Sequence, residues 1–191
     1  MEATEHEHYI LYKPFGFLSQ FIYNKKRKKR LLGELHPFAA GTMAIGRLDE
    51  DSEGLLLLST DGMESERIRS KKVEKEYFVM VDGIITQEAV EILKQGVLIG
   101  LHGQKYKTKP CECRLIFDVM LPPTTQRIRD MRHGPVSWIS ITLTEGKFRQ
   151  VRKMTAAVGF PTLRLVRVRI GNIEIGNMQA GEVLETDFLG I

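Results

Sequence analysis

The sequence predicts an α+β protein, with a largely antiparallel mixed β-sheet flanked by a few helices in two intimately packed halves. Strand-like segments outnumber segments with helical periodicity. The connections between neighbouring strands have the length of hairpins. No repeat or linker divides the 191 residues, so we expect a single domain over residues 1–191.

The expected strands are identified from their residue composition and from the Pro and Gly residues that end them. Residues 8–12 are expected to form the first strand, which ends at a turn that contains Pro14 and Gly16, and residues 17–23 the next. The run Leu55–Leu58 is apolar on both faces, which is typical of a buried strand. Aromatic, β-branched or alternating patterns predict further strands at residues 76–81, 138–144, 162–170 and 173–175.

Three helices are expected, at residues 62–68, 87–95 and 149–158. Asp61 and Thr86 can cap the first two. Glycine stops are expected at Gly96 and Gly159. The second helix should bury one side, made of Ala89, Val90, Ile92 and Leu93, and the third should bury Val151, Met154 and Val158. Residues 97–135 show strand-like pieces without a clear period.

Basic residues cluster along the chain although the net charge is only +4. An uninterrupted basic run lies in an expected surface loop at residues 24–31, and it consists of Lys25, Lys26, Arg27, Lys28, Lys29 and Arg30. Two later clusters contain Lys147, Arg149, Arg152 and Lys153, and then Arg164, Arg167 and Arg169. Such clusters favour a polyanionic partner such as RNA. A solvated loop without a partner is the alternative for the basic run.

Other features exclude several classes of protein. No apolar run approaches the roughly 20 residues that span a bilayer, and the N-terminus lacks the pattern of a signal peptide, so we expect a cytoplasmic protein. Cys111 and Cys113 are expected to be reduced, because residues two apart in a strand rarely form a disulfide. Neither His102 nor His133 completes a zinc-type spacing with them. We expect no metal and no cofactor.

The segment from Gly46 to Gly54 sets four carboxylates directly before the apolar run Leu55–Leu58. They belong to Asp49, Glu50, Asp51 and Glu53. A buried strand would hold this segment at a sheet edge, where a carboxylate can meet a substrate. A solvated turn is the alternative.

Four segments resemble the RsuA-type pseudouridine synthases. They are Gly-Arg-Leu-Asp at 46–49 with Ser-Glu-Gly-Leu-Leu-Leu-Leu at 52–58, Tyr-Lys-Pro-Phe-Gly at 12–16, Glu-Lys-Glu-Tyr at 74–77, and Glu-Gly-Lys-Phe-Arg-Gln-Val-Arg-Lys-Met at 145–154. They occur in the family's order, and the similarity continues through residues 158–167. It covers nearly the whole chain except the basic loop, residues 97–135 and the ends.

The resemblance implies roles for individual residues. Asp49 corresponds to the catalytic nucleophile, which must be ionised and therefore needs a cation beside it, and Arg152 corresponds to that cation. Tyr77 corresponds to the active-site tyrosine, which can stack on a flipped uracil. Substrate-binding roles follow for Arg47, Lys147, Arg149 and Val151. Whether Asp49 attacks the sugar or removes one of its protons stays open.

The resemblance also implies a substrate. The chain is similar to the E-type large-subunit members of the family, so we expect it to isomerise one uridine of 23S ribosomal RNA, or of a large-subunit assembly intermediate. The first strand begins by Tyr9, so we expect no separate N-terminal RNA-binding domain. The basic loop, Arg164 and Arg167 would then select the target. We expect a monomer without an obligate protein partner.

Two other functions remain open on the sequence. The first is a non-catalytic RNA-binding or ribosome-assembly protein that retains the synthase fold. The second is an acid/base hydrolase that uses Asp49 with a neighbouring carboxylate, but it explains neither the basic clusters nor Tyr77.

Overall fold

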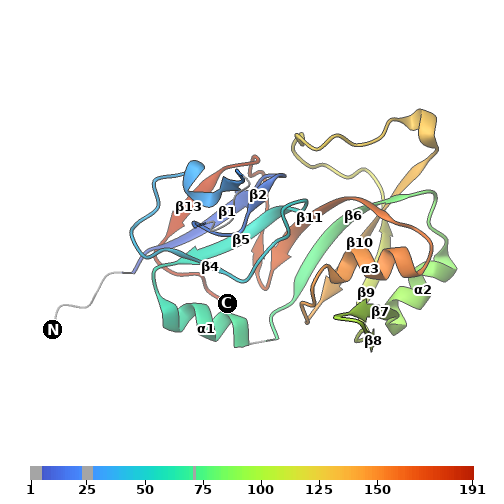
Figure 1. The fold of residues 1–191 in the computed structure, drawn as a ribbon, viewed down its shortest axis with the longest axis horizontal. Coiled ribbons are helices and arrows are strands. Elements are labelled where there is room, and N and C mark those ends of the chain that lie inside the picture. The colour runs from blue at the N-terminus through green and yellow to red at the C-terminus, as the bar shows by residue number, and fades with distance from the viewer. Residues whose placement is uncertain (1–5, 23–27, 71) are drawn as a thin grey trace. The chain divides into compact units, whose positions relative to one another are not determined.

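The computed structural model describes residues 6–22, 28–70 and 72–191, and the chain folds into two compact units. Unit 1 consists of residues 1–73, 122–126 and 169–191, and unit 2 of residues 74–121 and 127–168. Both contain strands and helices, which confirms the predicted α+β class (Figure 1).

Unit 1 is built on antiparallel strands. β1 (His8–Lys13) lies between β5 (Glu53–Ser59) and β13 (Val183–Thr186), with Leu11 opposite Leu56 on one side and opposite Val183 on the other. β4 (Met43–Ile45) also pairs with β5. All seven residues of β5 are buried, as its apolar composition predicts. The remaining elements of unit 1 are β2 (Phe17–Leu18), β3 (Arg30–Leu31), η1 (Leu32–Glu34), α1 (Gly62–Ser70) and β12 (Ile173–Glu174).

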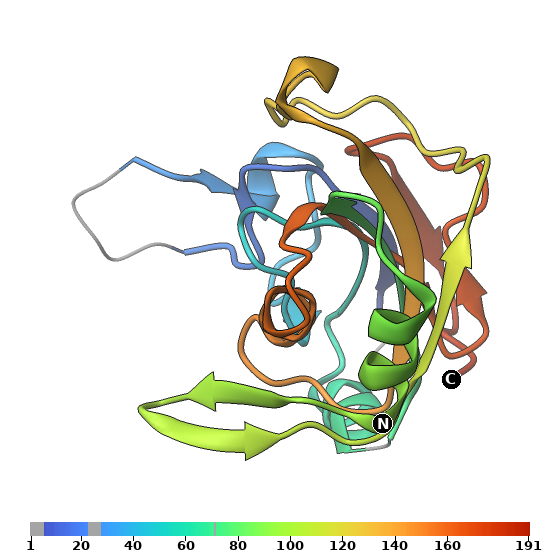
Figure 2. The same ribbon diagram turned by 90° about the vertical axis from the view of Figure 1, so that its right-hand side faces the viewer.

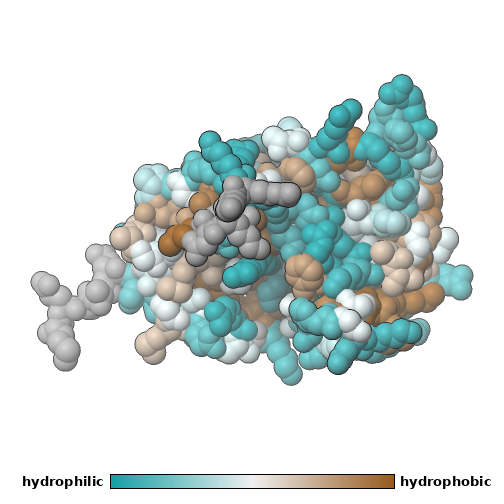
Figure 3. Space-filling view, in the orientation of Figure 1, coloured by the Kyte–Doolittle hydropathy of each residue, from teal (hydrophilic) through white to brown (hydrophobic). Residues whose placement is uncertain are grey.

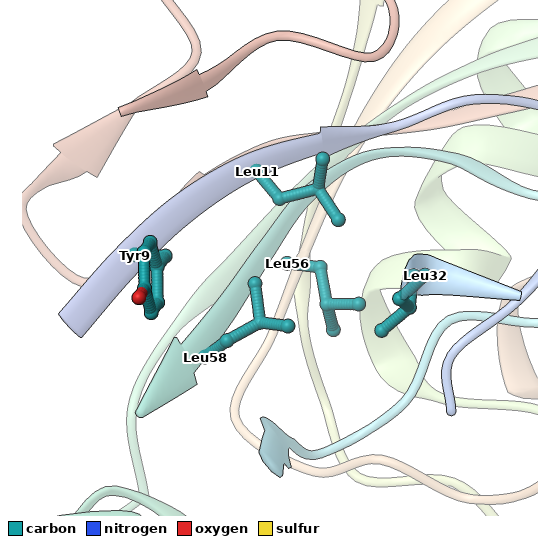
Figure 4. Close-up of a cluster of buried hydrophobic side chains, with 5 residues drawn as sticks. All are labelled: Tyr9, Leu11, Leu32, Leu56 and Leu58. Carbon is teal, nitrogen blue, oxygen red and sulfur yellow. The ribbon is translucent and has the colours of Figure 1, made fainter. Parts of the chain in front are cut away.

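The core of unit 1 joins strands to the segment that follows the basic loop. Tyr9 and Leu11 of β1, Leu56 and Leu58 of β5, and Leu32 of η1 form one buried cluster (Figure 4). Burying each leucine contributes about 1.5–3 kcal/mol relative to leaving it in water. The cluster therefore fixes both the second half of β5 and the chain just after the basic loop.

Unit 2 contains the strand order β11–β6–β10–β9, in which β10 (Val136–Leu143) lies antiparallel to β6 (Lys75–Asp82) and to β9 (Glu112–Ile116). β11 (Thr162–Ile170) ends in unit 1 with its last two residues. A separate hairpin of β7 (Leu98–Leu101) and β8 (Gln104–Lys107) projects as an arm (Figure 2). The other elements are α2 (Gln87–Gln95), η2 (Met131–His133) and α3 (Gln150–Ala157).

The helix caps confirm the sequence predictions. The N–H of Met63 donates to Asp61 Oδ1 at 2.8 Å, and the N–H of Ala89 donates to Thr86 Oγ1 at 3.2 Å. Gly96 ends α2 with φ of 83°, and a Cβ there would lie 2.2 Å from the carbonyl oxygen of Thr108. Only glycine fits this position without displacing the chain.

Several predicted elements need correction. Of the strand expected at 17–23, the described residues 17–22 contain only the two-residue β2, which pairs in parallel with β3, on the far side of the basic loop. Ile92 is 44% exposed and does not belong to the buried side of α2. Residues 97–135 contain β7, β8 and β9, and the short strands β4 and β13 were not predicted.

The cysteines are both free. Cys113 is buried in β9, whereas Cys111 precedes the strand and donates its S–H to the carbonyl oxygen of Leu93 at 3.3 Å, so the two do not share a strand face as expected. Among the residues that the structure describes, no helix is long and apolar enough to cross a membrane.

Candidate active site

The loop between β4 and β5 carries Arg47 and Asp49. Gly46 opens it with φ of 78°, a conformation that favours glycine. Arg47 is exposed, Leu48 is buried and Asp49 is half-buried. The N–H of Ser52 donates to the carbonyl oxygen of Asp49 at 3.0 Å, which closes a turn directly before the buried strand. Asp49 is therefore mounted at the entrance of β5.

Hydrogen bonds hold the residues on both sides of Asp49. Ser19 Oγ accepts from the N–H of Leu48 at 2.9 Å and donates to the carbonyl oxygen of Leu48 at 2.7 Å. The N–H of Gly16 donates to the carbonyl oxygen of Glu50 at 2.8 Å. The backbone of Leu48 and that of Glu50, on either side of Asp49, are thus fixed by the chain that follows β1.

The turn after β1 is itself anchored by a buried lysine. Lys13 is fully buried, and its Nζ donates to the carbonyl oxygens of Pro14 at 2.9 Å and Phe17 at 2.8 Å. A buried ammonium group is costly unless it is hydrogen-bonded. These bonds close the turn that presents the N–H of Gly16 to the Asp49 loop.

The basic loop reaches the same segment. Lys29 Nζ lies 2.7 Å and 2.8 Å from the two carboxylate oxygens of Glu50. Lys28 is exposed, and the guanidinium carbon of Arg30 lies 3.8 Å from the ring centroid of Phe17. The other predicted basic residues of the loop, Lys25, Lys26 and Arg27, lie outside the described residues.

In unit 2, Tyr77 lies in β6 opposite Ile141 of β10. Its side chain is 9% exposed, and Lys75 lies on the same face of the strand because side chains two apart share a face. Burial lowers the pKa of Lys75, and the positive charge of Arg167 lowers it further. A cation of perturbed pKa therefore accompanies Tyr77.

The start of α3 carries the other candidates. Arg149 is the N-cap in the left-handed conformation, with φ of 52°, so it precedes α3 and is not the first residue of the helix as predicted. Val151 is buried and Arg152 half-buried in the first turn. The αL residue turns the chain sharply, which separates Arg149 from the helix surface.

Glu145, in the loop before α3, accepts hydrogen bonds from three other segments. Its Oε1 accepts from the N–H of Lys109 at 2.9 Å and from Gln150 Nε2 at 2.7 Å, and its Oε2 accepts from the hydroxyl of Tyr106 at 2.6 Å. Burial raises the pKa of Glu145, but these hydrogen bonds and the charge of Lys147 outweigh it, so the pKa lies below its ordinary value. The carboxylate ties β8 to the loop before α3.

Arg164 and Arg167, predicted as RNA contacts, are 7% and 3% exposed. This burial differs from that of a typical surface phosphate contact. Arg167 instead contributes positive charge beside Lys75.

The predicted residues thus divide between the units. Unit 1 holds Arg47, Asp49 and the basic loop, and unit 2 holds Tyr77, Lys147, Arg149, Val151, Arg152, Arg164 and nearly all of β11. Sequence reasoning missed Ser19, the role of Lys29 toward Glu50, and Lys75. Only Lys75 had a local indication, because it lies two residues before Tyr77 in a strand.

Comparisons with known proteins point to one family. Residues 7–157 match the model of a family described as RNA pseudouridylate synthase. A ribosomal large subunit pseudouridine synthase E of Xanthomonas axonopodis pv. citri (strain 306) is 41% identical over 166 residues, which cover 85% of each chain. A synthase E of Vibrio vulnificus (strain CMCP6) is 38% identical over 186 residues, which cover 95% of this chain and 76% of the relative.

A solved structure supports the same relationship. A crystal structure of a pseudouridylate synthase superposes with a TM-score of 0.76 at 26% identity, covering 97% of this chain and 72% of the other.

Proposed function

This chain belongs to the RNA pseudouridylate synthase family, and we propose that it isomerises a specific uridine of 23S ribosomal RNA to pseudouridine. The observation that carries the proposal is the similarity to large subunit synthases E, 41% identical over 85% of each chain in one case. That match is stronger in identity than the 36% shared with a ribosomal small subunit synthase A of Escherichia coli (strain K12) over 72% of this chain. This difference supports a large-subunit substrate.

We assign the central chemistry to Asp49. The isomerisation breaks the bond from N1 of uracil to C1′ of the ribose, turns the base, and forms a bond from C5 to C1′. The proton on C5 leaves to solvent and N1 gains one. An ionised carboxylate can act on the sugar in this sequence, either as nucleophile or as base. The turn of Asp49 with Ser52 and the hydrogen bonds that hold the backbone of Leu48 and Glu50 support a fixed position for Asp49.

In this proposal Arg152 is the cationic catalytic residue that acts with Asp49, a role carried over from the resemblance to the family. Tyr77 stacks on the flipped uracil, and Val151 forms part of the wall behind it. Arg47, exposed on the Asp49 loop, holds the extruded nucleotide or its phosphate. Lys147 and Arg149 bind the substrate at the start of α3.

RNA recognition is assigned first to the basic loop, residues 24–31, whose described lysines reach solvent or Glu50. Because Arg164 and Arg167 are buried, they contribute positive electrostatic potential rather than direct contacts to phosphates. We further propose one catalytic domain, a monomer in the cytoplasm without an obligate protein partner, and a reaction without cofactor or metal, because the rearrangement needs no redox partner.

Tritium release tests the function. Unmodified large-subunit rRNA labelled with tritium at C5 of uridine is incubated with the wild type, with Asp49→Asn and with Asp187→Asn, a control at an exposed carboxylate of unit 1. We expect release by the wild type and the control, and a rate at least roughly 10³-fold lower for Asp49→Asn. RNA binding by all three proteins without release would instead identify a non-catalytic RNA-binding protein.

A further inference from the structure

Phe148 is 62% exposed although the loop that carries it is held firmly. The N–H of Lys147 donates to Gln150 Oε1 at 2.9 Å, and the N–H of Gln150 donates back to the carbonyl oxygen of Lys147 at 3.1 Å. Arg149 adds the left-handed turn. A large apolar ring is therefore exposed to solvent on a fixed backbone, and it lacks the stabilisation that burial would give.

Lysine ammonium groups lie over aromatic rings on this surface. Lys153 Nζ is 5.1 Å from the ring centroid of Phe148 and donates to the carbonyl oxygen of Gly100 in β7 at 2.8 Å. Lys147 Nζ is 5.1 Å from the ring centroid of Tyr106 in β8. Both distances are within the range of cation–π attraction. The β7–β8 hairpin and the loop before α3 thus form one surface.

The charge of this surface is strongly positive. Residues 98–110 and 144–153 contain seven lysines and arginines against one carboxylate. The cations are Lys105, Lys107, Lys109, Lys147, Arg149, Arg152 and Lys153. The carboxylate is Glu145, whose oxygens already accept three hydrogen bonds within the surface. In the space-filling view, hydrophilic and apolar side chains are interleaved over α3 and the hairpin (Figure 3).

We propose that Phe148 and the β7–β8 hairpin form a second RNA-contact surface, where an unpaired base stacks on Phe148 and flanking phosphates bind Lys105 and Lys107. Lys105 and Lys107 are exposed and share one face of β8, as side chains two apart in a strand do. Alternating cations and an exposed aromatic ring are what a single strand requires. The inference rests on the proposed function, because it takes RNA as the substrate.

The occupant is a single-stranded or looped segment rather than a duplex. In a duplex the base faces are stacked inside the helix, and only phosphates and groove edges are offered. Phe148 can stack only on a base that has left its stack. The surface would therefore hold nucleotides that flank the target uridine.

The test uses Phe148→Leu, which keeps an apolar side chain but removes the ring, and Phe188→Leu, a matched control at a Phe that is 68% exposed in unit 1. The probes are a fluorescein-labelled single-stranded RNA of about 12 nucleotides and a duplex of the same length. We expect Phe148→Leu to weaken single-strand binding about 10-fold. Phe148→Tyr should restore it, and Phe188→Leu should leave it unchanged.

The hairpin is tested separately by its salt dependence. Replacing Lys105 and Lys107 together by Ala should lower the slope of log K against log salt concentration by about 1.4 for the single strand. An unchanged slope, or equal affinities for wild type and Phe148→Leu, overturns the proposal.

Two further outcomes would also contradict it. If Phe148→Leu loses the same affinity for the single strand and for the duplex, no base stacks on Phe148. If Phe148→Leu changes the oligomeric state, Phe148 forms a contact between copies of the chain instead.

Tritium release by the wild type distinguishes failure of the proposed synthase activity from failure of the second RNA-contact surface. If the wild type releases tritium and Phe148→Leu binds RNA normally, the second surface is wrong and the synthase stands. If no tritium is released but Phe148→Leu loses single-strand binding selectively, the surface stands and the synthase activity is wrong.

Discussion

Lys29 forms an ion pair with Glu50, with its Nζ 2.7 Å and 2.8 Å from the two carboxylate oxygens. Lys29 belongs to the basic loop that we assign to RNA binding, and Glu50 directly follows Asp49. A phosphate that binds Lys29 would compete with the Glu50 carboxylate for the same ammonium group. The pair therefore links occupancy of the basic loop to the segment that mounts the proposed nucleophile.

Lys29→Ala should slow the reaction as well as weaken binding, whereas Lys28→Ala at the neighbouring exposed position should only weaken binding. Both variants lose one cation, but only the first releases Glu50. We expect a single-turnover rate of tritium release at saturating RNA that is about 3- to 10-fold lower for Lys29→Ala. Equal rates for the two variants would show that the pair does not position Asp49. Its contribution to folding stability should stay within about 1 kcal/mol, because the pair is partly exposed.

Ser19→Ala should lower kcat more than it raises KM. The variant removes both hydrogen bonds to the peptide of Leu48, immediately before Asp49. Leaving those polar groups unsatisfied should cost about 1–3 kcal/mol of unfolding free energy, measured by urea titration. Ser70→Ala is the control, because Ser70 is exposed at the end of α1 and its loss should change stability by less than about 0.5 kcal/mol. Loss of stability with an unchanged kcat would assign Ser19 a purely structural role.

Glu145→Gln should loosen the β7–β8 hairpin. The folded-state pKa of Glu145 lies below its ordinary value, so its ionisation stabilises the folded state above that ordinary value, and this stabilisation is lost as the pH falls through the folded pKa. Amide hydrogen exchange of Lys109 at neutral pH should accelerate about tenfold in the variant. Acidification should accelerate it in the wild type alone, relative to the intrinsic exchange rate. Glu112→Gln, at an exposed carboxylate of β9, should behave like the wild type.

The cysteines should resist alkylation in the folded protein. Burial raises the pKa of Cys111 to about 11 and that of Cys113 to about 12. At pH 8 iodoacetamide should therefore react about 100-fold more slowly with the folded protein than with protein in urea, since the thiolate is the reactive form. Comparable rates would mean that the thiols are accessible and ordinary.

The same shift predicts a loss of stability at high pH. A thiol with a raised folded-state pKa leaves stability intact below its unfolded pKa, and the stability falls as the pH rises from there toward the folded pKa. For Cys113 the expected loss is about 1 kcal/mol at pH 10. Comparing urea midpoints of the wild type and Cys113→Ala at pH 8 and pH 10 isolates it, because the variant lacks this thiol.

The elements that could be predicted are those whose cause is local. Leu55–Leu58 is apolar on both faces, so β5 follows from composition. Thr86 and Gly96 bracket α2 by the hydrogen bond and the backbone conformation that each supplies. By contrast, β2 exists only through its parallel partner β3, beyond the basic loop, and no pattern in residues 17–23 shows that pairing.

The site residues that lie in family motifs could be predicted, whereas those whose position depends on the packing of distant segments could not. Asp49, Tyr77 and Arg152 were assigned through resemblance to a family, and their roles remain predictions. The bonds of Ser19 to Leu48 depend on how two loops meet, which sequence spacing does not encode. Arg164 and Arg167 were assigned to RNA contact because they belong to a basic cluster, and the fold buries both.

The pairing of β1 with β13 sets the order in which the protein can be completed during synthesis. β1 is synthesised early, but one of its two neighbours is β13, the last strand among the residues that the structure describes. Until residues 183–186 have been synthesised, one row of backbone groups of β1 lacks its native acceptors and donors, as happens in unfinished sheets that aggregate. Unit 2, made almost entirely from the middle of the chain, has no such delay. Premature termination before Val183 would therefore leave the half that carries Asp49 incomplete while the half that carries Tyr77 could already be folded.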